Sequence, residues 1–412
     1  MNKKDVLIEQ LAVSSLNLVC DQGLDNFSIR NVAEAANCSV TPVTKRFKTK
    51  ADLLHAAQSE AYGADLQFHE AFAEQVDGMP FSFENLTEMV VSYVEQRAQF
   101  RVARFWSELL VKSSLGLSSK DVLAHWYRMR VNFWQNQLQA EKRKLHQWLA
   151  EFIAIYTMME EFYAYELYPS IHYRFLLKEG VRSMLAKSFG IENRDSVSGA
   201  ICFWLNKGQV ALSEFDRQDT SDLAEKLLDL ASEEIRKKGV GSLSQRTLAK
   251  KAGASSAMIG YHFGNMANFT NQAIWHVLMR EIPASLDPKE NPQVKQKNNA
   301  EWLHALKRLI SIESEAGRAG FYTQYARTTG QACLLSARQH ALHPLIEHLR
   351  RIDGWGTYRS GKSVWPETMA VARGTAMAFG VWIKGLAIIH EALGENFVLE
   401  DDRLLGAAEL LF

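Results

Sequence analysis

The chain contains an internal repeat, and this repeat constrains its fold more than any other feature of the sequence. Residues 23–54 and 239–270 align without a gap at a constant offset of 216 residues. Identical pairs include Gly23/Gly239, Ser28/Ser244, Arg30/Arg246, Ala33/Ala249, Ala36/Ala252, Ser39/Ser255 and Phe47/Phe263. The same offset pairs Phe105-Trp106 with Phe321-Tyr322, far downstream. The chain is therefore expected to hold two copies of one structural unit, and the downstream pair hints that a whole module was duplicated.

Each copy is typical of a unit of three short helices. Apolar residues recur at helical spacing before Gly23, which is suited to end the first helix. Ser28 is a candidate N-cap for a second helix, and Asn37 or Gly253 can adopt the left-handed backbone of a tight turn. Ser39 and Ser255 are the candidate caps of the third helix. Phe47 and Phe263 are expected to end it and fill the small core, and a longer helix is expected from Lys50 and from Met266.

Two short helices joined by a tight turn form the helix-turn-helix geometry, whose second helix fits the major groove of DNA. The outward side chains of the third helix are predicted to be Val40, Thr41, Thr44 and Lys45, and Ser256, Ala257, Gly260 and Tyr261 in the second copy. Residues 236–280 contain seven lysines and arginines and no acidic residue, and Lys45, Arg46, Lys48 and Lys50 cluster in the first copy. A basic run alone usually marks a solvated face, but here it coincides twice with the same helical pattern.

Both copies resemble the amino-terminal domain of the TetR/AcrR family of transcriptional regulators. The resemblance rests on residues 261–265, Tyr-His-Phe-Gly-Asn, and residues 46–54, Arg-Phe-Lys-Thr-Lys-Ala-Asp-Leu-Leu, and covers about fifty residues twice. It implies DNA contacts from residues of both copies: Ser28, Thr41, Thr44, Lys45, Arg46, Lys50, Ser244, Ser256, Tyr261 and His262. The capped helix ends at Ser39 and Ser255 add backbone N–H groups that suit phosphates.

The two copies depart from the family pattern at two positions. The family's phosphate-binding tyrosine is replaced by Thr44 and by Gly260, and its lysine after the turn survives as Lys50 but is Met266 in the second copy. A lost lysine–phosphate contact weakens DNA binding and its salt dependence. The second copy is therefore expected to grip DNA less tightly or to bind a different half-site.

The sequence predicts an all-α protein of four domains, with DNA-binding domains at 1–60 and 221–280 and helical regulatory domains at 61–215 and 281–412. Helical periodicity predicts long helices at 86–111, 120–141, 145–167, 171–189 and 196–215, and then at 301–314, 324–337, 345–351 and 367–393. Residues 283–299 and 354–366, rich in proline, glycine and polar residues, are expected to be exposed loops. The apolar stretch 371–389 contains Arg373 and Lys384, so a buried interface helix is expected rather than a membrane span.

The resemblance implies that the helical domains bind a small effector and form a dimer interface. The first region is rich in aromatic residues, and a flat or apolar effector is predicted to contact a set of them with one arginine: Trp106, Trp126, Arg130, Phe133, Tyr156 and Tyr163. The alternative is that these side chains are ordinary core. The second region, which contains Tyr322, Tyr325 and Trp355, is shorter and less aromatic, and is expected to serve mainly in packing.

Other classes of chemistry find little support in the sequence. The four cysteines, Cys20, Cys38, Cys202 and Cys333, lack metal or disulfide spacing and fit reduced thiols in a cytoplasmic protein associated with the bacterial nucleoid. His340, His343 and His348 lack the partner ligands of a metal site, so no metal and no cofactor are expected. No phosphate loop, nucleophile elbow or metal-ligand helix motif is present, and an enzyme is not expected.

The sequence therefore favours a regulator, most simply a repressor, that places two recognition helices in adjacent major grooves of one operator. Because those helices differ, the operator is expected to be asymmetric. The short segment 216–221 spans at most about 20 Å, so the chain acts either as a monomeric pseudo-dimer or through a further homodimer. The rival interpretation is a sensor or protein-interaction module that keeps this fold and has lost specific DNA binding.

Overall fold

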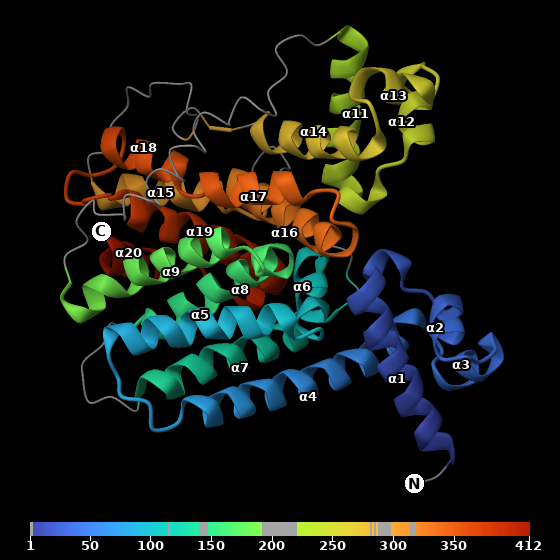
Figure 1. The fold of residues 1–412 in the computed structure, drawn as a ribbon, viewed down its shortest axis with the longest axis horizontal. Helices are drawn as coiled ribbons and strands as arrows, with labels where there is room; N and C mark the ends of the chain where they lie inside the picture. Colours follow the sequence, from blue (N-terminus) through green and yellow to red (C-terminus); the bar gives the residue numbers. More distant parts are fainter. Residues whose placement is uncertain are drawn as a thin grey trace.

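The computed structural model describes residues 3–113, 116, 118–139, 147–191, 221–280, 282–283, 286, 298–313 and 319–412. Within these ranges the protein is all-α, and no residue belongs to a β-strand. Figure 1 shows a large body of packed helices from which two smaller helical units project on the same side. The predicted helix at 196–215 and most of the predicted loop at 283–299 lie outside the described residues.

The first projecting unit, called head 1 here, has the predicted order of helices. It consists of α1 (Lys3–Gln22), the 3₁₀ turn η1 (Leu24–Asn26), α2 (Ile29–Ala35) and α3 (Val40–Arg46), and α4 (Lys50–Val76) leads from it into the body. Gly23 (φ 80°) ends α1, and Asn37 (φ 52°) makes the left-handed turn between α2 and α3. The Ser28 hydroxyl accepts a hydrogen bond from Asn31 N at 3.1 Å and so caps α2 as predicted.

The second unit, head 2, repeats this arrangement. It consists of α11 (Asp222–Lys238), η5 (Val240–Ser242), α12 (Gln245–Ala252) and α13 (Ala257–Phe263), followed by α14 (Met266–Met279). Gly239 (φ 88°) and Gly253 (φ 74°) have positive φ angles, as Gly23 and Asn37 do at the equivalent positions of head 1. Both α4 and α14 begin at the predicted residue, and their N-caps, Thr49 and Asn265, are equivalent positions in the two copies.

The third helices are capped differently from the prediction. Ser39 is the N-cap of α3, but its side chain makes no capping hydrogen bond. In head 2 the N-cap of α13 is Ser256, not Ser255, and its side chain also makes no capping hydrogen bond. Pro42 lies in the first turn of α3, where its missing N–H costs no hydrogen bond.

The body is built from helices of both halves of the chain. The first half contributes α5 (Phe83–Gln99), α6 (Ala103–Val111), α7 (Lys120–Gln139), α8 (Leu149–Leu167), α9 (Ile171–Leu185) and η3 (Ala186–Phe189). The second half contributes α15 (Asn299–Leu309), α16 (Phe321–Gln339), α17 (His343–Ile352), α18 (Trp355–Ser363), α19 (Arg373–Leu393), η6 (Gly394–Asn396) and α20 (Asp401–Leu411).

The repeat extends into the body. Helices α5 and α15 begin 216 residues apart, at Phe83 and Asn299, and their N-caps Ser82 and Asn298 accept hydrogen bonds from Asn85 N and Glu301 N. Capping residues at equivalent positions start equivalent helices, because each satisfies an otherwise unbonded backbone N–H. The two halves are therefore versions of one longer module, as the downstream aromatic pair suggested.

The two halves share one core, centred on α8 and α19. Every residue of α8 except Glu151 is buried, and α19 is buried except near its carboxyl end. A helix that is apolar on all sides must be surrounded, and α8 packs on α5 and α7 of its own half and on α16, α17 and α19 of the other. Phe152 and Trp382 stack across the junction with ring centroids 5.0 Å apart.

Helix α19 with η6 has the length and apolarity of a membrane span, yet 89% of its most apolar 18-residue window is buried inside the molecule. Gly385 allows this close packing, because a Cβ there would lie 2.5 Å from the carbonyl oxygen of Ile155 on α8. The buried interface helix predicted for 371–389 is therefore present, beginning at Arg373.

Some predicted boundaries were wrong. The single helix expected at 86–111 is broken at residues 100–102 into α5 and α6, and the helix expected at 301–314 ends at Leu309. The loop expected at 354–366 instead contains α18, followed by buried Val364 and Trp365. Its glycines serve close packing, since a Cβ on Gly361 would lie 2.5 Å from Val371 and one on Gly356 would lie 2.9 Å from the Leu286 carbonyl oxygen.

Candidate nucleic-acid interface and interior sites

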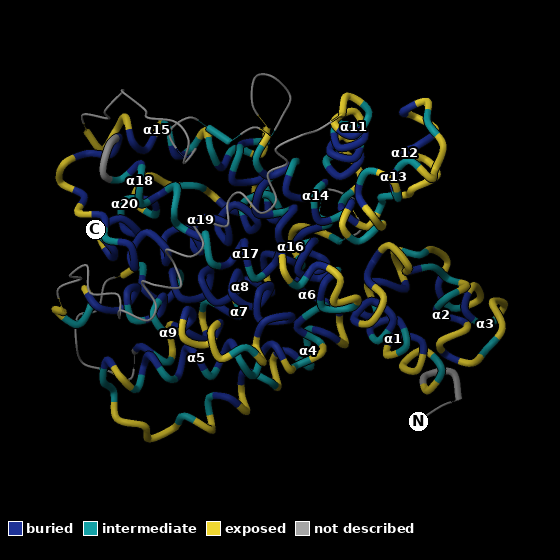
Figure 2. Tube along the Cα trace, turned by 45° about the horizontal axis from the view of Figure 1, so that its top comes forward, coloured by how far each residue is buried: buried dark blue, intermediate teal, exposed yellow. Residues whose placement is uncertain are grey.

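Helix α3 carries an exposed outer face in head 1. Val40 is 44% exposed, and Thr41, Thr44 and Lys45 are also exposed, while Val43 on the opposite face is fully buried. These are the four side chains predicted to point outward. Figure 2 shows the same contrast for the whole unit, with exposed surface along α2 and α3 and a buried inner side.

Helix α13 has the corresponding exposed face in head 2. Tyr261 is 80% exposed, the most exposed large apolar side chain of the described residues, and Ser256 and Ala257 are also exposed. Ile259 and Phe263 face inward and are buried. The Tyr261 ring meets the neighbouring His262 ring edge-on at 5.0 Å, and most of its aromatic surface stays available to a partner.

Three residues predicted to contact DNA are less available than their neighbours. Arg46 folds back along α3, and its Nη1 donates to the Pro42 carbonyl oxygen at 3.3 Å. Lys50 is half-buried, with Nζ 5.5 Å from the centre of the Phe27 ring. His262 is also half-buried, and its Nδ1 lies 3.4 Å from Ser221 Oγ at the start of α11. Ser39, Ser244 and Ser255 are exposed, and Ser28 is half-buried at its cap.

The basic surface of head 2 is partly neutralised by an acidic residue just outside the basic run. Glu234 on α11 forms ion pairs with Lys238 and Lys251, each at 2.5 Å. The hydrogen bonds from these two lysines lower the pKa of Glu234 to about 2. Arg246 and Lys250 of α12 remain exposed. Charge alone therefore overstates how strongly head 2 attracts an anion.

The two heads meet at their 3₁₀ turns. A Cβ on Gly241 of η5 would lie 2.8 Å from Asp25 Oδ2 of η1, and Asp25 also pairs with Lys112 at 2.5 Å. Beneath the turns, buried Glu108 of α6 accepts from Leu24 N at 3.3 Å and pairs with Arg338 of α16 at 2.5 Å. These contacts fix head 1 to both halves of the body.

Gln331 of α16 anchors the other turn. Its Oε1 accepts from Val240 N and its Nε2 donates to the Val111 carbonyl oxygen, both at 3.1 Å. Gly239 leaves room for this side chain, because a Cβ there would lie 2.8 Å from Gln331 Oε1. Both heads therefore rest on one platform formed by α6 and α16 and project from the same side of the body (Figures 1 and 2).

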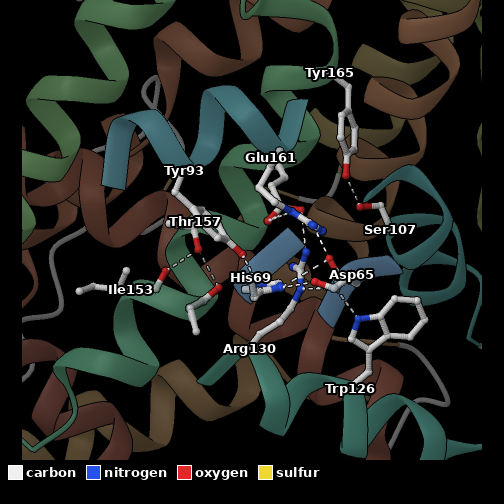
Figure 3. Close-up of polar contacts among 12 residues, drawn as sticks. Asp65, His69, Tyr93, Ser107, Trp126, Arg130, Ile153, Thr157, Glu161 and Tyr165 are labelled. Atoms are coloured by element: carbon white, nitrogen blue, oxygen red, sulfur yellow. Dashed lines mark hydrogen bonds and ion pairs between the residues drawn. The ribbon is translucent and has the colours of Figure 1, made fainter. Parts of the chain in front are cut away.

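The interior of the first half is filled by a network of charged side chains (Figure 3). Asp65 of α4 pairs with Arg97 and Arg130, and the Trp126 indole donates to it at 2.5 Å. Glu161 of α8 pairs with the same two arginines, at 3.3 and 3.1 Å. Two carboxylates thus face two guanidinium groups, which is how buried charges are tolerated.

This network sets the protonation of its members. Burial alone raises the pKa of Asp65, but Arg97 and Arg130 outweigh burial and hold it well below its ordinary value. Burial lowers the pKa of His69 to about 4. His69 Nδ1 lies 2.6 Å from the Asp65 carbonyl oxygen and Nε2 lies 2.9 Å from the Tyr93 hydroxyl. A neutral ring that donates from Nδ1 and accepts at Nε2 satisfies both contacts.

The residues predicted to bind an effector in the first half are all buried: Trp106, Trp126, Arg130, Phe133, Tyr156 and Tyr163. The structure brings Trp106, Trp126 and Arg130 together, with the Arg130 guanidinium 5.4 Å from the centre of the Trp106 ring. Phe133 packs on His69 and Tyr93 nearby. Tyr156 and Tyr163 lie apart from this group, at the junction of the halves, where Tyr156 donates to Glu160. Effector binding by these six stays a prediction.

An aromatic-lined cavity lies instead in the second half, between α14, α16, α18 and α19. Its lining includes Phe321, Tyr322, Tyr325 and Trp355, with Asp353 and Lys384 as the charged residues. The sequence analysis did not predict this cavity, because it counted aromatic residues without knowing which of them pack together. Tyr163 is the predicted residue nearest this cavity, since Lys384 Nζ donates to its hydroxyl at 2.6 Å.

His340, His343 and His348 do not form a cluster with metal-binding character among the described residues. His340 and His343 both contact Glu166 of α8 through Nδ1, at 3.2 and 2.8 Å, and thereby link the two halves. His348 is buried, and its ring packs edge-on against Trp275 at 5.2 Å.

Comparison with known proteins adds no relative to this picture. No family model matches the chain, and a search of curated proteins finds no match.

Proposed function

We propose that this protein is a sequence-specific DNA-binding regulator of transcription that resembles the TetR/AcrR family and acts as a pseudo-dimer within one chain. In this proposal α2–α3 and α12–α13 are two helix-turn-helix units, and the remaining helices are regulatory bundles fused at α8 and α19. The observation that carries the proposal is the pair of exposed short helices, α3 and α13, held on the same side of one platform. A small ligand in the body would alter the spacing of the two heads and release DNA.

Physical chemistry supports this use of the heads. A short exposed helix with a buried inner face fits the major groove, where each base pair presents a distinct pattern of donors and acceptors. Threonine, lysine, serine and tyrosine side chains on α3 and α13 suit base edges and phosphates. Because the outer faces of α3 and α13 differ, the preferred site would be asymmetric.

A second candidate, a sensor or interaction module without specific DNA binding, is favoured by two observations. Glu234 pairs with Lys238 and Lys251 and so removes part of the positive charge of head 2, and the second copy has Met266 where the first has Lys50. If this candidate is right, head 2 binds another protein rather than DNA, and exposed Tyr261 becomes its contact residue.

Selection from a random DNA pool with the full-length chain distinguishes the two candidates. If the protein is a sequence-specific regulator, the selected DNA molecules should share one common sequence pattern. The affinity for that pattern should exceed the affinity for unrelated DNA by about 10³-fold or more. Retention of no related family, or equal affinity for all sequences at every salt concentration, would refute sequence-specific binding and favour the second candidate.

A further inference from the structure

The cavity of the second half has the character of a ligand site. The volume open to the centres of water-sized molecules is about 70 Å³. A single water molecule needs only about 10–15 Å³ of such volume. Phe321, Trp355 and Ile352 on the cavity lining are partly exposed, so the cavity reaches the surface, while Asp353 and Lys384 at its inner end are buried. The volume of about 70 Å³ is roughly half of the ~150 Å³ of an engineered cavity that encloses benzene, so a single ring enters with its polar end inward and its remainder at the open mouth.

The cavity has one unfilled hydrogen-bonding position. Asp353 is 5% exposed, and its Oδ1 accepts from Lys384 Nζ. Among the described residues, no group donates a hydrogen bond to Asp353 Oδ2. A buried carboxylate oxygen without a donor is costly, so a bound molecule that supplies one gains that unused interaction.

The surrounding charges select an uncharged ligand. Lys384 already neutralises Asp353, and Arg373, which donates to the Asp353 carbonyl oxygen at 2.9 Å, adds a further positive charge. A cationic ligand would be repelled by these two groups, and an anionic one would meet the Asp353 carboxylate. The walls are aromatic, formed by Phe321, Tyr322, Tyr325 and Trp355, and they favour a flat ring.

We propose that this cavity binds one uncharged monocyclic aromatic molecule whose hydroxyl or N–H group donates a hydrogen bond to Asp353. Phenol is the simplest compound with these properties. The site differs from the effector site expected in the first half, where guanidinium groups and carboxylates occupy the interior.

The cavity is connected to both the heads and the junction of the halves. Met279 at the end of α14 lines it, so a ligand touches the helix that carries head 2. Lys384, the partner of Asp353, also donates to Tyr163 of α8. A ligand that engages Asp353 therefore acts on contacts that set how the halves sit together, and this regulatory consequence rests on the proposed function.

Calorimetric titration of the full-length chain without DNA tests the binding. Phenol is expected to bind with one site per chain and about tenfold or more tighter than toluene, which has the ring but no donor. The Ile352→Trp variant narrows the cavity and keeps the side chains of both Asp353 and Lys384, and it should abolish phenol binding, whereas Ile312→Trp, at a 39% exposed position, should not. No phenol binding, equal binding of toluene, or unchanged binding by Ile352→Trp would overturn the proposal.

The effect of the ligand on DNA binding is tested separately, with the DNA sequences obtained by the selection. Phenol at saturation is expected to change the affinity for that DNA at least fivefold, and the change should vanish in Ile352→Trp. Phenol that binds but leaves DNA affinity unchanged overturns the regulatory role and leaves the binding site standing. A chain that binds phenol but no DNA refutes the proposed function alone.

Discussion

At the scale of single residues, the buried side chain of His69 makes the stability of the first half depend on pH. It is 3% exposed, and burial lowers its pKa to about 4. In the unfolded chain this histidine has its ordinary pKa near 6.5, so between pH 6.5 and pH 4 it binds a proton that the buried ring of the folded chain does not bind. Between pH 6.5 and pH 4 the folded state therefore loses stability as the pH falls.

We expect this residue to lower the free energy of unfolding by about 2 kcal/mol between pH 7.5 and pH 5. Urea unfolding at both pH values measures the loss, and His69→Asn should reduce it. His55→Asn, at an exposed position of α4, is the matched control and should leave it as in the unmodified chain. An equal loss in all three proteins would contradict the assignment of His69.

Arg350 tests the charged contacts at the junction of the halves. It is buried, and its Nε and Nη2 donate to the two carboxylate oxygens of Glu160 at 3.1 and 2.7 Å. Arg350→Met leaves the buried Glu160 carboxylate without its ion-pair partner and should lower the free energy of unfolding by about 3–5 kcal/mol. Adding Glu160→Gln removes that charge: its amide oxygen can accept from Tyr156, and its NH2 can donate to the Tyr173 hydroxyl, which still donates to the backbone carbonyl oxygen of residue 160. The double variant should therefore regain most of the loss. A double variant no more stable than Arg350→Met would show that lost packing dominates.

At the scale of elements, the crossing of α8 and α19 depends on Gly385. A Cβ at this position would lie 2.5 Å from the Ile155 carbonyl oxygen, so Gly385→Ala forces the two central helices apart. We expect a loss of about 1–3 kcal/mol. Gly63 in α4 is the control, because a Cβ there meets nothing within 4 Å. Gly63→Ala should stabilise the protein by about 0.5–1 kcal/mol through helix propensity. Thermal unfolding of both variants measures the contrast, and changes of the same sign would contradict it.

Helix α3 is tested through the salt dependence of DNA binding. Exposed Lys45 would neutralise one phosphate, so Lys45→Ala should weaken binding and lower the slope of log affinity against log salt by about 0.9. Lys187→Ala, at an exposed position of η3, whose main contacts are with α9 and α20, should leave the slope unchanged. Fluorescence anisotropy at several salt concentrations gives both slopes, and equal slopes in all proteins would remove Lys45 from the interface.

An element could be predicted from sequence where nearby residues determine its ends. It could not where packing against distant residues determines them. The heads were placed well because Gly23, Asn37 and Gly253 mark turns that need a positive φ and Ser28 caps a helix locally. Helix α18 was missed because Gly354 and Pro366 signal a loop, whereas close packing against Val371 and Leu286 decides the outcome. The break between α5 and α6 was missed because no glycine or proline marks it.

At the scale of the whole molecule, the candidate sites follow from how the two halves combine. The exposed faces of α3 and α13 were predictable from local periodicity, since each lies within one short helix. The cavity at Asp353 was not, because α14, α16, α18 and α19 meet only after folding. The pairing of Lys238 and Lys251 by Glu234 also escaped prediction, because Glu234 lies outside the basic run in sequence.

Fusion of the halves has one mechanical consequence. Both heads rest on α6 and α16 and touch through Asp25 and Gly241, so the distance between α3 and α13 is set by the platform. Two separate protomers can adjust their spacing by shifting at their interface. One chain with a shared core can do so only by deforming that core or its turns, so it should tolerate little variation in half-site spacing.

Hydroxyl-radical footprinting of the full-length chain on its selected DNA tests the central claim most directly. The account predicts two protected segments about 10 base pairs apart on one face of the duplex, with different sequences and with one chain bound per site. Insertion of five base pairs between the segments should abolish binding. A single protected segment, or two identical half-sites occupied by two chains, would contradict the claim that α3 and α13 of one molecule bind neighbouring grooves.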